Sequence, residues 1–148
     1  MSTVAVKPSL TIKRRFNAPP EKVFQAWTDP GKVKRWMGPG EIRALSAECD
    51  ARSGGGYRWV MQAPNGEQHD VGGIYREIVP NEKLVFTWAW KSTPERESLV
   101  TVTFKQDGSG TIMTLLHEQF FDEKARDDHN RGWTGTMDKL EAYIGGQQ

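Results

Sequence analysis

The spacing of apolar residues changes from a two-residue period to a helical period soon after the start of the chain. Apolar and polar side chains alternate over residues 9–17, which predicts a β-strand. From Pro20 the apolar residues follow helical spacing as far as residues 29–30, which predicts a short helix. A second short helix is predicted around Val33 and Trp36, because a Gly-Pro-Gly sequence follows directly after it.

The middle of the chain returns to short alternating runs that are separated by turn-forming residues. Six further strands are predicted there, at residues 42–48, 57–62, 69–79, 83–91, 98–105 and 111–119. The separators are rich in glycine, proline, asparagine and serine, which favours hairpin connections between neighbouring strands. Gly72 and Gly73 lie inside the third of these runs, and they predict a β-bulge that bends the sheet.

The last part of the chain has a helical period again. After residue 122 the apolar residues fall on one face, which predicts a long helix ended by Gly145; they are Trp133, Met137, Leu140, Tyr143 and Ile144. The order of elements therefore predicts an α+β domain. It consists of a seven-stranded antiparallel sheet, a long C-terminal helix that covers one face, and two short helices between the first and second strands.

Strand parity predicts which face of the sheet the long helix covers. Phe86, Trp88 and Trp90 share one face of their strand, and Trp59 and Met61 share one face of theirs. We predict that these side chains face inward. A bent sheet that wraps around one helix does not close onto it fully, so bulky rings can leave a pocket between the two layers.

Composition adds to this prediction and excludes several classes of function. The 148 residues predict one domain, 1–148, with its core at about 9–144. Six Trp, six Phe and three Tyr make up 10% of a chain that is only 36% hydrophobic, so large rings do most of the burying. The 20 basic and 19 acidic residues nearly cancel, so no strong field attracts nucleic acid or an acidic membrane.

Targeting signals and cysteine content favour a cytoplasmic protein. Cys49 is the only cysteine, so no disulfide forms within the chain. The sequence contains no signal-peptide pattern and no run of about 18 apolar residues, so no membrane span is predicted. Basic residues cluster at 13–15, with Lys32, Lys34 and Arg35 expected nearby, and we interpret them as a solvated charged face.

The sequence contains no pattern that predicts catalysis. His69, His117 and His129 lack the paired spacing of a metal site, so no metal and no cofactor are predicted. His117 and Glu118 are neighbours on one strand and face opposite sides of the sheet, so they do not form an acid–base pair on one substrate. We expect His117 to be a partly buried, hydrogen-bonded histidine.

Three ordered blocks of sequence resemble a known family over roughly residues 10–144. They are FNAPPEKVFQAWTDP with WMGP (16–30, 36–39), GIYREIVP with KLVFTW (73–80, 83–88), and LHEQF with the region from Gly132 to Leu140. The chain is thereby similar to the family named after the activator of the heat-shock-protein-90 ATPase. Met37 departs from the pattern, because many members have a second tryptophan there.

The resemblance places the chain in the START-related, birch-pollen-allergen-like superfamily (SRPBCC), and it carries expectations about fold and ligand. It implies the helix-grip fold, in which a curved seven-stranded sheet surrounds a long C-terminal helix. It also implies a hydrophobic cavity between sheet and helix, which holds lipids, hormones, polyketides or other natural products across the superfamily. The family name further implies a role beside a stress-response chaperone.

We therefore expect a non-enzymatic protein that binds a hydrophobic small molecule. The residues predicted to line its cavity are Trp59, Met61, Phe86, Trp88, Trp90, His117, Phe120, Trp133 and Met137. Three alternatives stay open at this point: a polyketide cyclase or aromatase, a stimulator of a chaperone ATPase, and rings that only fill the core. A homodimer formed through an exposed sheet edge also stays open.

Overall fold

The computed structural model describes residues 7–146, so residues 1–6 and 147–148 of the predicted domain lie outside the described part. Ten elements follow one another in the predicted order. They are β1 (Leu10–Phe16), α1 (Pro20–Thr28), α2 (Pro30–Trp36), β2 (Arg43–Cys49), β3 (Gly56–Gln62), β4 (Gln68–Val79), β5 (Lys83–Trp90), β6 (Ser98–Asp107), β7 (Gly110–Glu118) and α3 (Glu123–Gly145).

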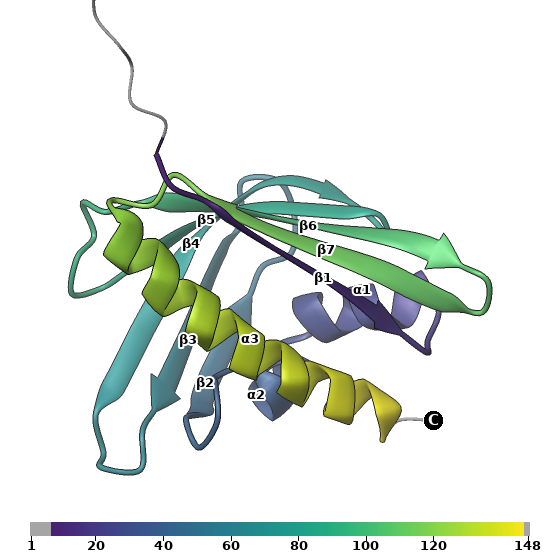
Figure 1. Cartoon of the computed structure of the whole chain (residues 1–148), viewed down its shortest axis with the longest axis horizontal. Helices are drawn as coiled ribbons and strands as arrows, with labels where there is room; N and C mark the ends of the chain where they lie inside the picture. The colour runs from purple at the N-terminus through teal and green to yellow at the C-terminus, as the bar shows by residue number, and fades with distance from the viewer. Residues whose placement is uncertain (1–6, 147–148) are drawn as a thin grey trace, which may run out of the picture.

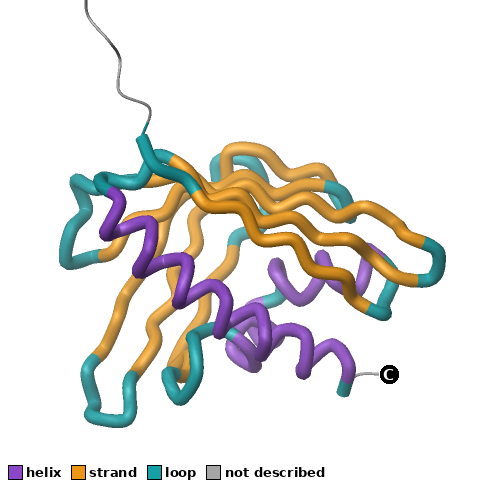
Figure 2. The backbone as a smooth tube through the Cα atoms, viewed as in Figure 1, coloured by secondary structure: helices purple, strands orange, loops and turns teal. Residues whose placement is uncertain are grey.

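The seven strands form one antiparallel sheet in the order β1-β7-β6-β5-β4-β3-β2. The sheet curls around α3, which crosses its concave face, while α1 and α2 lie toward the C-terminal half of α3 (Figure 1, Figure 2). This confirms the predicted α+β helix-grip fold with two short helices between the first two strands.

The bulge in β4 is not where the glycines predicted it. The register of β4 against β5 changes between Tyr75 and Glu77, so the prediction of a register shift at Gly72 and Gly73 is wrong. Each glycine is needed instead for close approach to a neighbouring strand, Gly72 to Tyr57 of β3 and Gly73 to Thr87 of β5. A Cβ atom on Gly73 would lie 2.1 Å from the carbonyl oxygen of Thr87, a distance at which only a hydrogen atom fits.

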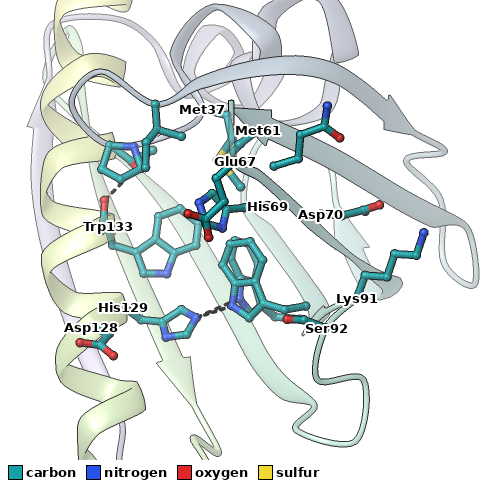
Figure 3. Close-up of a pocket in the computed structure, with 17 residues that line it drawn as sticks. Met37, Met61, Glu67, His69, Asp70, Lys91, Ser92, Asp128, His129 and Trp133 are labelled. Carbon is teal, nitrogen blue, oxygen red and sulfur yellow. Dashed lines mark hydrogen bonds between the residues drawn. The ribbon is translucent and has the colours of Figure 1, made fainter. Parts of the chain in front are cut away.

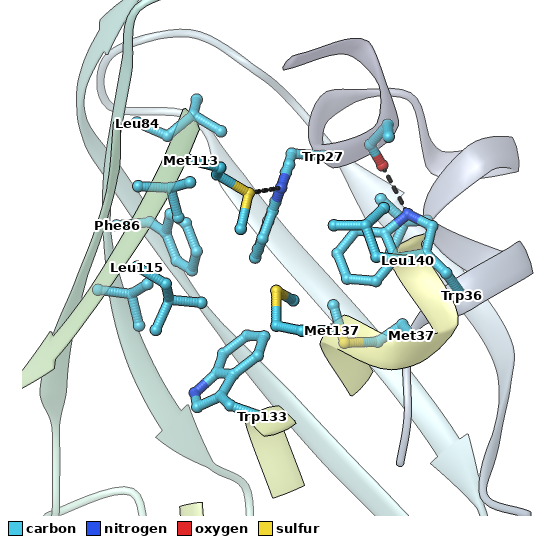
Figure 4. Packing of buried hydrophobic residues seen from close by; sticks show 14 of the residues in the cluster. Trp27, Trp36, Met37, Leu84, Phe86, Met113, Leu115, Trp133, Met137 and Leu140 are labelled. Atoms are coloured by element: carbon cyan, nitrogen blue, oxygen red, sulfur yellow. Dashed lines mark hydrogen bonds between the residues drawn. The ribbon is translucent and has the colours of Figure 1, made fainter. Parts of the chain in front are cut away.

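Tryptophans from the two short helices occupy the centre of the core. The rings of Trp27 and Trp36 meet edge to face with their centroids 4.8 Å apart. Trp27 donates its indole N–H to the sulfur of Met113, and Trp36 donates its own to the carbonyl oxygen of Ala26. Met137 of α3 reaches the same cluster (Figure 4). The two short helices therefore cover one end of the concave face of the sheet, and α3 alone faces the other end.

Ion pairs join the basic cluster at residues 13–15 to its surroundings. Arg14 of β1 bridges to Asp138 and Glu141 of α3, and Arg15 bridges to Asp107. These contacts support the interpretation of the cluster as a solvated charged face, because they are partly exposed and internally neutralised. Within residues 7–146, no helix combines the length and the apolar character that crossing a membrane requires.

Candidate functional site

An open pocket of about 830 Å³ lies between the first half of α3 and the strands β3 to β5 (Figure 3). The loop that follows α2 forms its third side. Its apolar lining consists of Met37, Pro39, Ile42, Met61, Trp88, Trp90, Gly132 and Trp133. Its polar lining consists of Glu67, Gln68, His69, Asp70, Lys91, Ser92, Asp128, His129 and Thr136. The pocket thus has an aromatic interior and a charged rim.

The structure divides the nine predicted cavity residues into three groups. Those that line the pocket are Met61, Trp88, Trp90 and Trp133. Phe120 lines a smaller adjacent hollow of about 220 Å³, together with Trp88 and Trp90. The remaining four are buried in the core behind the pocket wall: Trp59, Phe86, His117 and Met137. Strand parity identifies inward-facing side chains, but it does not tell a side chain that lines a pocket from one that packs behind it.

His129 is the central polar residue of the site, although the sequence indicated only that its spacing does not fit a metal site. Its Nδ1 atom lies 2.7 Å from the carbonyl oxygen of Ala125, so Nδ1 carries the proton of the neutral ring. Its Nε2 atom then accepts hydrogen bonds from two indoles, from Trp90 over 2.9 Å and from Trp88 over 3.3 Å. Burial lowers the pKa of His129, since desolvation disfavours the charged ring.

His117 makes a second hydrogen-bonded group behind the first. Its Nδ1 atom accepts from the indole N–H of Trp133 over 2.9 Å, which places its proton on Nε2. Nε2 therefore donates to the hydroxyl of Ser98 over 2.7 Å, and that hydroxyl donates to the carbonyl oxygen of Trp88. His117 is fully buried and hydrogen-bonded at both nitrogens, as expected from the sequence, although its burial exceeds the predicted partial burial.

These hydrogen bonds decide what the Ser98–His117 pair can do. A serine nucleophile needs an imidazole nitrogen with a free lone pair to take its proton. In this pair the facing nitrogen carries the proton, because Trp133 occupies the lone pair of the other one. Burial and the neighbouring His129 lower the pKa of His117 well below its ordinary value, so the ring stays neutral. The pair is therefore arranged for packing and not for nucleophilic catalysis.

The polar groups at the rim include one ion pair that faces solvent. Asp70 accepts hydrogen bonds from the Arg58 guanidinium, which lowers the pKa of that carboxyl group. Lys91 lies on the same side of the pocket as Asp70, whereas Glu67 lies next to His69 (Figure 3). In the part of the chain that the structure describes, no three histidine, cysteine or acidic side chains gather as a metal site requires.

The sequence contained a signal for His129 but none for the rim residues. His129 precedes Trp133 by four residues, so both fall on one face of a helix. A histidine on the same helical face as a predicted pocket tryptophan is a candidate for the site. The rim residues Glu67 and His69 had no comparable signal, because they belong to the hairpin between β3 and β4 and only the curvature of the sheet brings them to α3.

Fold and pocket together define an α+β helix-grip domain with a groove between sheet and helix, the architecture of the SRPBCC superfamily. The chain belongs to the family of activator of Hsp90 ATPase homolog 1-like proteins, whose model matches residues 17–145. This confirms the resemblance seen in the sequence. None of the curated proteins compared with the chain matches it.

Solved structures of bacterial proteins share the fold over nearly their whole length. A protein of Chromobacterium violaceum is 27% identical, with a TM-score of 0.85, and the match covers 92% of this chain and 96% of that one. The AHSA1 protein of Silicibacter pomeroyi is 26% identical, with a TM-score of 0.87 and coverage of 95% and 100%. An uncharacterized protein of Rhizobium leguminosarum is 30% identical, with a TM-score of 0.79 and coverage of 93% and 94%.

Proposed function

We propose that this protein binds a small hydrophobic, aromatic molecule in the pocket between α3 and strands β3 to β5. The observation that carries the proposal is the state of the indoles in the wall. Trp88, Trp90 and Trp133 all line the pocket, and each donates its N–H to a histidine inside the protein. The wall therefore offers ring surface and no indole donor, which suits an apolar, flat ligand.

The size and the rim of the pocket refine the chemistry of this ligand. A volume of about 830 Å³ lies in the range typical of small-molecule sites. Lys91, Ser92, Gln68 and Glu67 at the mouth supply polar contacts for one end of a ligand whose apolar body lies deeper. Of the predicted residues, we propose that Met61, Trp88, Trp90 and Trp133 contact the ligand. Trp59, Phe86, His117 and Met137 support that wall from the core, and Phe120 borders the adjacent hollow.

Binding is favoured over the cyclase or aromatase alternative by the two histidines nearest the rings. Acid–base chemistry on a bound polyketide needs a basic or acidic atom that is free to exchange a proton with the ligand. Both nitrogens of His117 and both nitrogens of His129 are engaged with protein groups. The ring-lined interior therefore offers no histidine nitrogen to a ligand, and the side chains of Glu67 and His69 belong to the polar lining.

Titration with N-phenyl-1-naphthylamine, an uncharged aromatic probe, tests the proposal at neutral pH. Saturable binding, with quenching of tryptophan fluorescence, is expected for the wild-type protein. The blocking variant is Gly132→Phe, because Gly132 lines the pocket and a Cβ atom there meets no atom within 4 Å. It should fold normally and lose binding.

A matched control separates pocket blocking from a general effect of a bulky ring on α3. Thr134 is exposed on the same helix and does not line the pocket, so Thr134→Phe should bind the probe like the wild type. Absence of saturable binding to the wild type, or equal binding by Gly132→Phe and wild type, would contradict the proposal.

A further inference from the structure

The pocket and the smaller hollow beside it share one wall. Trp88, Trp90, Asp128 and His129 line both spaces, so these side chains lie between them. We call Trp88, Trp90 and His129 the partition. Trp88 is buried, whereas Trp90 is only half-buried, so part of its side chain is exposed to solvent.

A single nitrogen atom holds the two rings of the partition together. The indole N–H groups of Trp88 and Trp90, both on strand β5, donate to the same Nε2 atom of His129. The two indoles meet edge to face, with ring centroids 5.5 Å apart. Nε2 can accept both bonds only while it keeps its lone pair, that is, while the imidazole is neutral.

We propose that His129 is the positioning residue of the pocket wall, and that protonation of its Nε2 atom releases Trp88 and Trp90 and opens the partition between the two spaces. The proposal rests on the proposed function, because it concerns the regulation of the same pocket. Protonation places an N–H group where the two indoles need an acceptor, so three donors then face one another. Of the two rings, the half-buried Trp90 is the one that moves out of the partition.

The groups around His129 do not supply a substitute acceptor. His117 of β7 lies with its ring centroid 5.2 Å from that of His129, and a second positive charge there is unfavourable. His69 of β4 packs edge to face on Trp90. Asp128 precedes His129 on α3, but its carboxylate pairs with Lys124 and Arg131.

Six other charged side chains border the two spaces, and none of the six is hydrogen-bonded to the His129 ring. They are Glu67, Asp70 and Lys91 in the pocket, and Arg96, Asp122 and Lys124 in the hollow. Their charges nearly balance, and the hydrogen bonds of the His129 ring go to an uncharged carbonyl and to two indoles. Protonation therefore acts on the partition through the lost lone pair. Because burial lowers the pKa of His129, the change falls on the acid side of its ordinary value.

Indole N–H signals in ¹H–¹⁵N spectra, followed from about pH 8 to about pH 5, test the proposal directly. The signals of Trp88 and Trp90 are expected to shift together with one midpoint, and that midpoint should equal the one measured at the His129 ring. The signals of Trp27 and Trp36 should stay constant, because their acceptors are a sulfur and a carbonyl that do not titrate. Simultaneous change of all indole signals, which indicates unfolding, would overturn the proposal.

The variant His129→Gln supplies an acceptor that cannot be protonated in this range. Its amide oxygen reaches the position of Nε2, so the chemical shifts of the Trp88 and Trp90 indole N–H signals should not change with pH. The wild type should lose affinity for N-phenyl-1-naphthylamine several-fold as His129 is protonated, whereas the affinity of the variant, whatever its value at neutral pH, should not change over this pH range. If the indole N–H signals of Trp88 and Trp90 shift with pH in the variant as they do in the wild type, the role of His129 is refuted.

A second measurement does not depend on that variant or on ligand binding. Trp90→Phe removes one of the two N–H donors and keeps an aromatic ring. Because these donors stabilise the neutral imidazole, their loss should raise the pKa of His129 and leave that of His117 unchanged. An unchanged or lowered pKa of His129 would contradict the proposal. Failure of probe binding at neutral pH with these spectral results intact would refute only the proposed ligand.

Discussion

The indole N–H of Trp133 donates to Nδ1 of His117 over 2.9 Å, and both side chains are buried. The bond joins the first half of α3 to β7, and it fixes the position of the proton on the other side of the imidazole. His117 in turn donates to Ser98 of β6. One histidine thus connects the helix to two neighbouring strands through polar contacts inside the core.

Replacing His117 by leucine should destabilise the protein by about 1–3 kcal/mol, because the Trp133 N–H loses its acceptor in a buried place. The free energy of unfolding from urea titration measures this loss. His69→Leu is the matched control, since the His69 side chain is only half-buried and makes no hydrogen bond in the described residues. A loss no larger than that of the control would show that the Trp133–His117 bond contributes nothing.

Stability should fall as the pH falls below about 6.5, because His117, which is buried, and His129, which is half-buried, both have pKa values below those of the unfolded chain. The unfolded chain then binds protons that the native protein excludes. The stabilising contribution of the two neutral histidines is complete above their pKa in the unfolded chain. It is lost as the pH falls from that value through their lower pKa in the folded protein. Each such histidine contributes about 1.4 kcal/mol per pH unit within that window.

Urea unfolding at a series of pH values above about 5.5 checks this dependence before most carboxylates titrate. The variant His129→Gln should show a shallower slope, because only one of the two histidines with a lowered pKa remains. A stability that is constant over this range, or one that rises on acidification, would contradict the neutral state of the two rings.

The sequence was sufficient for the strands and their inward faces but not for the polar contacts between layers. Trp88 and Trp90 could be assigned to the inner face because the two-residue period of β5 is a local property. Their shared acceptor, His129, lies about 40 residues further along the chain, as the separations of 41 and 39 positions show. Only the curvature of the sheet and the position of α3 bring them together, and the sequence pattern specifies neither.

The bulge illustrates the same limit on a smaller scale. Glycines favour several backbone features, and the pair Gly72–Gly73 could serve a bulge or a close approach equally well. The structure shows the close approach, with the register shift after Tyr75. The glycine residues therefore marked an unusual backbone position in β4, but only the neighbouring strands show that its role is close approach and not a bulge.

Two glycines on α3 should respond differently to alanine. Gly132→Ala should stabilise the protein by about 0.5–1 kcal/mol, because glycine is costly inside a helix and the new Cβ atom meets no atom within 4 Å. At Gly135 the new Cβ atom would lie 3.0 Å from the Cβ atom of Pro39, so the contact should cancel most of that gain. Thermal or urea unfolding compares the pair, and equal gains at both positions would contradict the packing of Pro39 on α3.

Gly73→Ala should destabilise the protein by about 3 kcal/mol or more, because the new Cβ atom would lie 2.1 Å from the backbone oxygen and 2.5 Å from the Oγ1 atom of Thr87. Relief requires β5 to move away from β4. Thr87 directly precedes Trp88, so the displacement should also shift the indole N–H signal of Trp88 in ¹H–¹⁵N spectra. Gly56→Ala is the matched control, since its Cβ atom would make an ordinary contact at 3.6 Å and should change stability by less than about 1 kcal/mol. Equal effects of the two substitutions would mean that β4 and β5 tolerate a side chain at this crossing and that the wall of the pocket does not depend on their close approach.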